Sequence, residues 1–228
     1  MALIIIILTL AFLLVVLPQL WITRALDTHA QERADIGGTG SEFARHALDA
    51  LKLTHVKVEP TEQGNHYDPE AKAVRLEPRF HNGKSLSAIT VAAHEVGHAM
   101  QDAMDLPMFK RRVRLARTAQ TFSWIAQAFL FAAPLLFVIG KGPAALILNV
   151  IGFVGSGLAS VAMQITTLPV EFDASFKRAL PLLERGKFLK PSDMPVARHL
   201  LRAAAFTYVA GLLRTLVSIP GMSRLPRW

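Results

Sequence analysis

The sequence predicts a mainly α-helical, integral membrane protein that also contains a small α+β region. Three observations favour this fold class. Long uncharged runs alternate along the chain with charged segments, and 52% of the 228 residues are hydrophobic. One charged segment contains short alternating stretches typical of strands, followed by an alanine-rich stretch typical of a helix. We therefore expect three to four transmembrane helices together with a small β-hairpin or sheet.

The uncharged runs define the expected membrane segments. Residues 1–23 carry no charged side chain and are long enough to span a bilayer, which predicts a retained N-terminal anchor. Residues 118–170 hold runs of 23 and 29 uncharged residues on either side of Lys141, which predicts a transmembrane hairpin with a turn at 140–143. Residues 203–228 form a C-terminal helix, and Arg214 leaves open whether this helix spans the membrane or lies in its interface.

The two charged segments are residues 24–117 and 171–202. In the first we expect a helix at 41–53 with Ser41 as its N-cap, strands at 55–60 and 73–78 around a turn-rich stretch, and a helix from about Ser87. The second is predicted to be helical with an interruption near 186–195. Five basic residues lie at 110–117 and seven lie within 171–202, so both segments are expected on the cytosolic side of the membrane.

Residues 91–101, VAAHEVGHAMQ, contain two histidines four positions apart with a glutamate directly after the first. Each residue of an α-helix advances by about 100°, so His94 and His98 lie on one face and can bind one metal ion. Glu95 lies beside them and can reach a water on that ion without being a ligand. This pattern is typical of zinc peptidases, in which the glutamate is the general base. The alternative is two histidines on an ordinary helix, but the small residues around them leave room for other backbone to approach.

A catalytic zinc needs a third protein ligand, and the chain has no cysteine. Residue 104 is Met, which excludes the pattern in which a third histidine follows six residues after His98. Glu171 is the candidate, because it is the first charged residue after the apolar hairpin and is expected on the same side of the membrane as the histidines. Asp173 is its rival. On a helix these two carboxylates diverge by about 200°, so they are not expected to bind the ion together.

Four stretches in this order, HYDPEAKAVRL, VAAHEVGHAMQ, LPVEFDAS and RAAAFTYVAGLL, resemble the bacterial membrane-bound neutral zinc metallopeptidases, the YugP-like group. The resemblance runs from residue 35 to residue 217. It implies a zincin-like α+β catalytic region with one Zn²⁺ ion, with His94 and His98 as motif ligands, Glu95 as the catalytic acid and Glu171 as the downstream ligand. It also implies a location in the bacterial inner membrane.

The sequence departs from the better-known membrane glutamate-zincins at Ser175, where those proteins have an aspartate four residues after the ligand. Since such an acid orients the zinc ligands, Ser175 and Asp173 are candidates for this role here. His66, Tyr67 and His199 are candidates for lining the cleft or stabilising an oxyanion. A structural turn or a solvated helix face is the alternative for each of these three residues.

The sequence thus predicts a membrane-bound zinc metalloendopeptidase whose partners are the lipid bilayer and peptide or protein substrates, including unfolded and membrane proteins. The alternative is a zinc-binding membrane scaffold or regulator without turnover. Glu95 favours the enzyme, because a scaffold needs no general base. The net charge of +8 also raises nucleic-acid binding, which we disfavour because no basic stripe interleaved with aromatic residues is present. The oligomeric state stays open.

Overall fold

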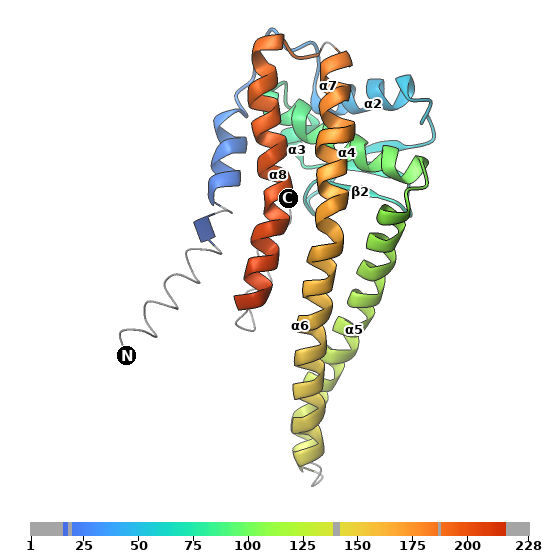
Figure 1. Ribbon diagram of the computed structural model, residues 1–228, viewed down its shortest axis with the longest axis vertical. Helices are drawn as coiled ribbons and strands as arrows, with labels where there is room; N and C mark the ends of the chain where they lie inside the picture. The colour runs from blue at the N-terminus through green and yellow to red at the C-terminus, as the bar shows by residue number, and fades with distance from the viewer. Residues whose placement is uncertain (1–15, 18–19, 139–141, 187, 218–228) are drawn as a thin grey trace, which may run out of the picture.

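The computed structural model describes residues 16–17, 20–138, 142–186 and 188–217 (Figure 1). Most of the predicted anchor at 1–23, part of the turn at 140–143 and residues 218–228 lie outside this description. After a helical stretch at residues 20–28, the elements are α2 (Gly40–Ala50), β1 (Lys57–Pro60), β2 (His66–Asp68), β3 (Ala73–Leu76), α3 (Pro78–His81), α4 (Leu86–Ala103), α5 (Pro107–Val138), α6 (Gly142–Phe172), the π-helix η1 (Asp173–Ala179), α7 (Leu180–Gly186), the 3₁₀ turn η2 (Pro191–Asp193) and α8 (Met194–Val217).

The three strands form one small sheet in the order β1-β3-β2. β3 pairs in parallel with β1 and antiparallel with β2, with Tyr67 opposite Val74. The strands predicted at 55–60 and 73–78 are confirmed. The assignment of residues 66–68 to a turn-rich stretch is wrong, because their three residues form β2, which is too short to show a readable alternation.

Two helices begin at polar caps, one of which differs from the prediction. α2 is capped by Thr39, whose side chain accepts from the backbone N–H of Glu42, while the Glu42 carboxylate accepts from the backbone N–H of Thr39. The prediction of Ser41 as the cap is therefore wrong: the glutamate three residues after Thr39 completes a capping box. α4 begins one residue before the predicted start, with Ser85 as its cap.

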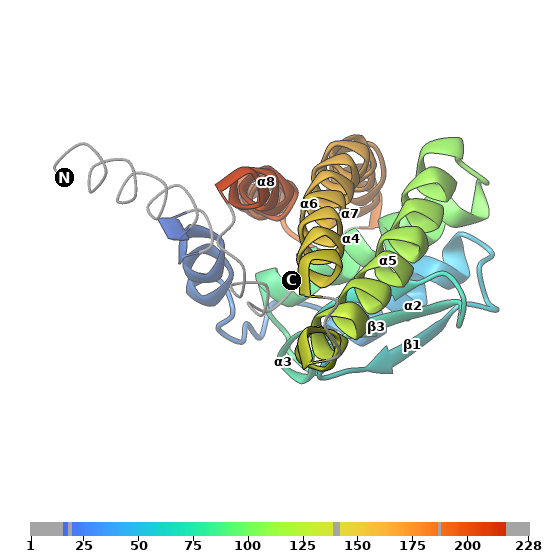
Figure 2. The same cartoon turned by 90° about the horizontal axis from the view of Figure 1, so that it is seen from below.

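α4 is the central element of the core. It packs against α2, α3 and the sheet on one side and against η1, α7 and α8 on the other. Its buried residues include four alanines and Gly97, small side chains that let neighbouring elements approach its backbone closely. Figure 2 shows the sheet and α2 on one side of α4, with α6 and α8 on the other.

α5 and α6 form a long helical hairpin that extends away from the sheet and α4 (Figure 1). The two helices cover most of residues 107–172, so the predicted pair of apolar helices is present as a hairpin. Within the part of the chain that the structure describes, however, no helix has the length and apolar character needed to cross a bilayer. The prediction of an integral membrane fold with three to four transmembrane helices is therefore wrong. The uncharged runs do not show where the helices begin and end, because α5 begins at Pro107 and includes the whole basic stretch 110–117.

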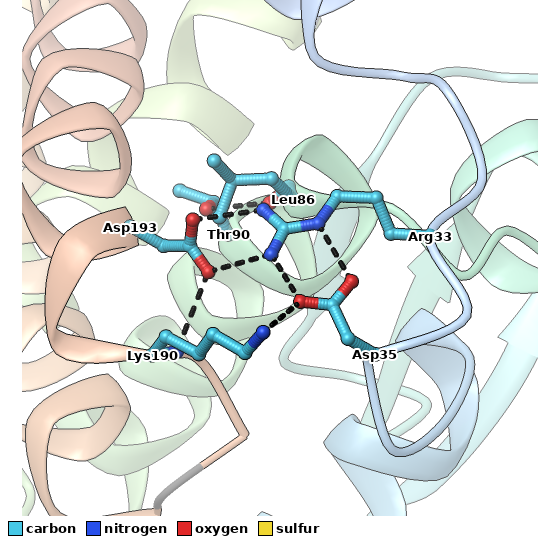
Figure 3. A network of polar contacts seen from close by, with 6 residues as sticks. All are labelled: Arg33, Asp35, Leu86, Thr90, Lys190 and Asp193. Atoms are coloured by element: carbon cyan, nitrogen blue, oxygen red, sulfur yellow. Dashed lines mark hydrogen bonds and ion pairs between the residues drawn. The ribbon is translucent and has the colours of Figure 1, made fainter.

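A polar network joins the N-terminal segment to the beginning of α8 (Figure 3). The guanidinium of Arg33 binds the carboxylate of Asp193 through two nitrogens, at 2.8 and 3.0 Å, and also binds Asp35. Lys190 contacts Asp35 at 2.9 Å and donates its backbone N–H to Asp193. These contacts connect residues 160 positions apart and hold η2, and so the start of α8, beside the core.

Candidate metal centre

The site lies where α4 meets the end of α6 and the beginning of η1. α4 carries His94, Glu95 and His98, all of which are buried. η1 approaches α4 closely at Gly97, where a Cβ atom would lie 2.7 Å from the backbone oxygen of Ala174. The prediction that small residues of the motif leave room for other backbone is thereby confirmed at Gly97. This close approach brings Glu171, in the last turn of α6, to the histidines.

His94, His98 and Glu171 form a cluster that can hold one metal ion. One ligand atom from each residue lies within 4.8 Å of the other two. Oε2 of Glu171 lies 3.1 Å from Nε2 of His94 and 3.4 Å from Nε2 of His98, and Glu171 is fully buried. Two imidazoles and a carboxylate are the donor set that catalytic zinc sites use, with a fourth position left for water or substrate. The residues present therefore fit a zinc ion.

Arg112, near the start of α5, balances the charge of Glu171. Its Nη2 lies 3.0 Å from Oε1 of Glu171. The two groups form an ion pair, but their alignment does not make a hydrogen bond. Burial raises the pKa of the Glu171 carboxyl, but the charge of Arg112 and the contacts with His98 and His94 outweigh it and hold this pKa well below its usual range. The carboxylate is therefore ionised and ready to bind a cation.

The two histidines have different partners at Nδ1. Nδ1 of His94 lies 3.1 Å from the hydroxyl of Ser175, and Nδ1 of His98 lies 2.9 Å from Oε1 of Gln101. Burial lowers the pKa of His94, but its hydrogen bond with Glu171 and the charges of Glu95 and Glu171 leave this pKa above its ordinary value. The Nε2 atoms of both histidines face Glu171, so the partners of their Nδ1 atoms lie on the side away from the cluster.

A protein family and a Bacillus subtilis protein each match most of this chain. The model of a family described as "Putative neutral zinc metallopeptidase" matches residues 4–225. The chain belongs to this neutral zinc metallopeptidase family. A Bacillus subtilis (strain 168) protein named "Putative membrane protease YugP" is 35% identical over 199 residues, which cover 85% of this chain and 83% of that protein. No solved structure matches the chain.

Membership of the family agrees with the resemblance inferred from the sequence motifs. It makes the chain a zinc-peptidase relative, in keeping with the donor set of the cluster. The roles of individual residues stay predictions.

Three other sequence candidates make hydrogen bonds or ring contacts with residues outside the cluster. Nδ1 of His66 contacts the backbone oxygen of Gly64, and His199 packs edge-on against Trp21. The hydroxyl of Tyr67 donates to Asp102 at 2.7 Å. Burial and this hydrogen bond raise the pKa of Tyr67, so its proton stays with the phenol and points at Asp102.

Asp173 does not join the metal cluster and instead contacts α4. Its Oδ2 accepts from Nε2 of Gln101 at 2.9 Å and from Nε of Arg178 at 3.2 Å. The structure thus keeps Glu171 and Asp173 apart, as their separation on a helix predicts, and gives Ser175 a contact with His94.

Sequence reasoning missed Gln101 and Arg112. A signal for Gln101 exists: it follows His98 by three residues on a helix, so the two side chains lie on one face. For Arg112 no such signal exists, because it is one of five basic residues at 110–117 and nothing in the sequence separates it from its neighbours.

Proposed function

We propose that the chain is a zinc-dependent endopeptidase in which His94, His98 and Glu171 bind the ion and Glu95 is the general base. The observation that carries the proposal is the convergence of the two imidazole Nε2 atoms on one ionised, fully buried carboxylate. Removing a carboxylate from water costs several kcal/mol, and removing the partner of a buried ion pair costs about 3–5 kcal/mol. Stability alone therefore does not explain why Glu171 is buried. Membership of a zinc metallopeptidase family supports the same function.

Each residue of the site has a different proposed role in peptide hydrolysis. A zinc ion held by His94, His98 and Glu171 would polarise the scissile carbonyl and lower the pKa of water. Glu95, buried beside His94 on α4, accepts the proton of the attacking water on its carboxylate and returns it to the leaving amine nitrogen. Arg112 holds Oε1 of Glu171, so that Oε2 alone faces the histidines.

The test of catalysis is Glu95→Gln in the purified full-length chain. The amide keeps the size of the side chain but accepts no proton, so we expect hydrolysis of an unfolded protein such as casein to fall by about 10²- to 10⁴-fold. Zinc content, measured by atomic absorption, should stay at the wild-type level, because Glu95 is not a proposed ligand.

The control is Glu62→Gln, at an exposed glutamate between β1 and β2, which should leave both activity and zinc content unchanged. Undiminished cleavage by zinc-loaded Glu95→Gln would sink the proposed mechanism. A wild type that binds zinc but cleaves no peptide would instead favour the scaffold without turnover.

We also propose that the chain works at a bacterial membrane, with its site on the cytosolic face and with unfolded or membrane proteins as substrates. The name of the Bacillus subtilis relative, a membrane protease, supports the membrane location. So do large apolar side chains that the α5–α6 hairpin leaves exposed: Trp124, Phe131, Leu135, Val138, Leu146, Ile147, Val150, Ile151, Leu158 and Ile165. Recovery of the chain in the supernatant after sedimentation of the membranes from a detergent-free lysate would exclude this location.

A further inference from the structure

We propose that Gln101 is a positioning residue for the metal centre, and that with Asp173 it forms a relay that determines which nitrogen of His98 carries the proton. The inference rests on the proposed function, because it concerns the nitrogen of His98 that faces the ion. It goes beyond the proposed ligand set, which does not explain why Nε2 of His98 carries no proton and can therefore bind a metal ion.

The orientation of the Gln101 amide follows from its partners. Gln101 is fully buried in α4. Its Nε2 lies 2.8 Å from the backbone oxygen of Val170 and 2.9 Å from Oδ2 of Asp173. A backbone carbonyl and a carboxylate that is paired with Arg178 only accept hydrogen bonds. The amide NH₂ must therefore face the end of α6 and η1, which leaves Oε1 facing His98.

This orientation determines where His98 carries its proton. Oε1 of Gln101 lies 2.9 Å from Nδ1 of His98 and has no proton to donate, so Nδ1–H must be the donor. In a neutral imidazole the other nitrogen, Nε2, then keeps a bare lone pair. Nε2 is also the nitrogen that faces Oε2 of Glu171, at 3.4 Å. Gln101 thus favours the form of His98 that binds a metal through Nε2.

Two contacts oppose this arrangement. One is with Glu171, whose ionised Oε2 lies 3.4 Å from Nε2 of His98 and favours a proton on that nitrogen until a metal ion lies between them. The other is with Arg112. Nη1 of Arg112 lies 3.5 Å from Nδ1 of His98, and a guanidinium can only donate, so this contact favours a bare Nδ1. The distances decide between the two partners of Nδ1. The contact with Gln101 has the length of a good hydrogen bond, whereas 3.5 Å is the outer limit for one.

The other end of the relay is also fixed. Oδ2 of Asp173, a buried carboxylate, accepts from Nε of Arg178 as well as from Gln101. The position of the proton on His94 is not determined in this way, because its Nδ1 faces the hydroxyl of Ser175, which can either donate or accept a hydrogen bond. The acid expected to orient a zinc ligand is therefore Asp173, and it acts on His98 through Gln101.

The first test is Gln101→Met in the full-length chain. Methionine keeps the length of the side chain and removes both its acceptor and its donors. We expect the affinity for zinc, measured by competition with a chromophoric chelator, to fall by about 10- to 100-fold. The control is Gln120→Met, the same substitution at an exposed glutamine of α5, which should keep the wild-type affinity.

The second test reverses the relay with the double variant Gln101→Glu, Asp173→Asn. An oxygen still accepts from Nδ1–H of His98, while donor and acceptor are exchanged between positions 101 and 173. We expect this variant to recover part of the zinc affinity that Gln101→Met loses. The recovery is partial because the backbone oxygen of Val170 loses its donor and Nε of Arg178 loses its acceptor. A role in packing alone would not predict such a rescue.

The third measurement uses the wild type, so it does not depend on whether a variant folds. In ¹⁵N-histidine spectra of the zinc-bound wild type, His98 should show a hydrogen-bonded proton on Nδ1 that exchanges slowly with water. Zinc on Nδ1, or a freely exchanging Nδ1–H, would overturn the relay, and so would wild-type affinity in folded Gln101→Met. Failure of the wild type to bind zinc would overturn the proposed function as well, which keeps the two failures distinguishable.

Discussion

At Glu171, one carboxylate divides its two oxygens between different partners. Oε2 faces Nε2 of both histidines, and Oε1 faces the guanidinium of Arg112. A fully buried carboxylate needs a compensating positive charge, and the guanidinium of Arg112 is the largest of the charges that stabilise Glu171 here, ahead of His98. With zinc bound, the ion takes over part of this role, so the importance of Arg112 for stability depends on the metal.

Arg112→Met tests this dependence. Without zinc, the variant should lose about 2–3 kcal/mol of the free energy of unfolding, somewhat less than a fully buried pair because Arg112 is partly exposed. With saturating zinc the loss should shrink, because the ion compensates Glu171. Urea unfolding in the presence of chelator and of zinc measures both values.

The matched control is Arg114→Met, at an exposed arginine on the same helix, which should change stability little in either condition. Equal losses for Arg112→Met with and without zinc would show that Arg112 does not balance the charge of Glu171.

The contact between α4 and η1 sets the geometry of the site at the scale of elements. η1 is a π-helix that begins two residues after Glu171, and its Asp173, Ala174 and Ser175 are all buried against the core. π-helical turns inside longer helices are frequent at functional sites. Here the turn lies where Asp173 and Ser175 reach Gln101 and His94 respectively. The spacing between α4 and η1 is set by Gly97.

Gly97→Ala should separate these two elements. The added Cβ would lie 2.7 Å from the backbone oxygen of Ala174, which is rigid, so η1 must move. We expect a loss of about 1–3 kcal/mol in the free energy of unfolding, as for other overpacked sites. Because Glu171 lies only two residues before η1, zinc affinity should fall too, which chelator competition measures.

Gly155→Ala is the control, because a Cβ at this position of α6 meets no atom within 4 Å. Alanine there favours the helix slightly, so stability should stay level or rise. Wild-type zinc affinity in Gly97→Ala would show that the close approach of η1 is not needed for the cluster.

On the scale of the whole molecule, the cluster joins segments that are far apart in the chain. His94 and Glu171 are 77 residues apart, and the α5–α6 hairpin lies between them. A metal ion bound to both therefore holds the end of α6 to α4. Any ligand that binds the folded state alone stabilises it by mass action.

Zinc should accordingly raise the thermal unfolding temperature of the wild type, and a chelator should lower it. At a free zinc concentration of 1,000 times Kd the gain is about 4 kcal/mol. His98→Asn should lose most of this gain, whereas His55→Asn, at an exposed histidine outside the site, should retain it. An unfolding temperature that does not respond to zinc would contradict the proposed cluster.

Features that depend on neighbours in sequence could be predicted from the sequence. The spacing of His94 and His98 puts them on one face of α4, because the geometry of a helix is local. Strands β1 and β3 and the helical nature of residues 86–103 follow from equally local patterns. The capping residue of α2 and the three-residue strand β2 were missed, because each depends on a few atoms.

The prediction of transmembrane helices was wrong for a related reason. Uncharged runs indicate apolar stretches, but where each helix begins and ends depends on the whole chain. The family, in contrast, follows from motifs that the sequence carries in order, and the match over residues 4–225 confirms it.

By itself, then, the sequence determined the family, the helix of the motif and Glu171 as a candidate to join the histidines. Only the tertiary structure decided the partners of those residues: Ser175 for His94, Gln101 for His98 and Arg112 for Glu171. The reason is physical. A local pattern determines which side chains share a face of one helix, whereas the packing of α4 against α5 and η1, and its hydrogen bonds with the end of α6, determine what that face meets.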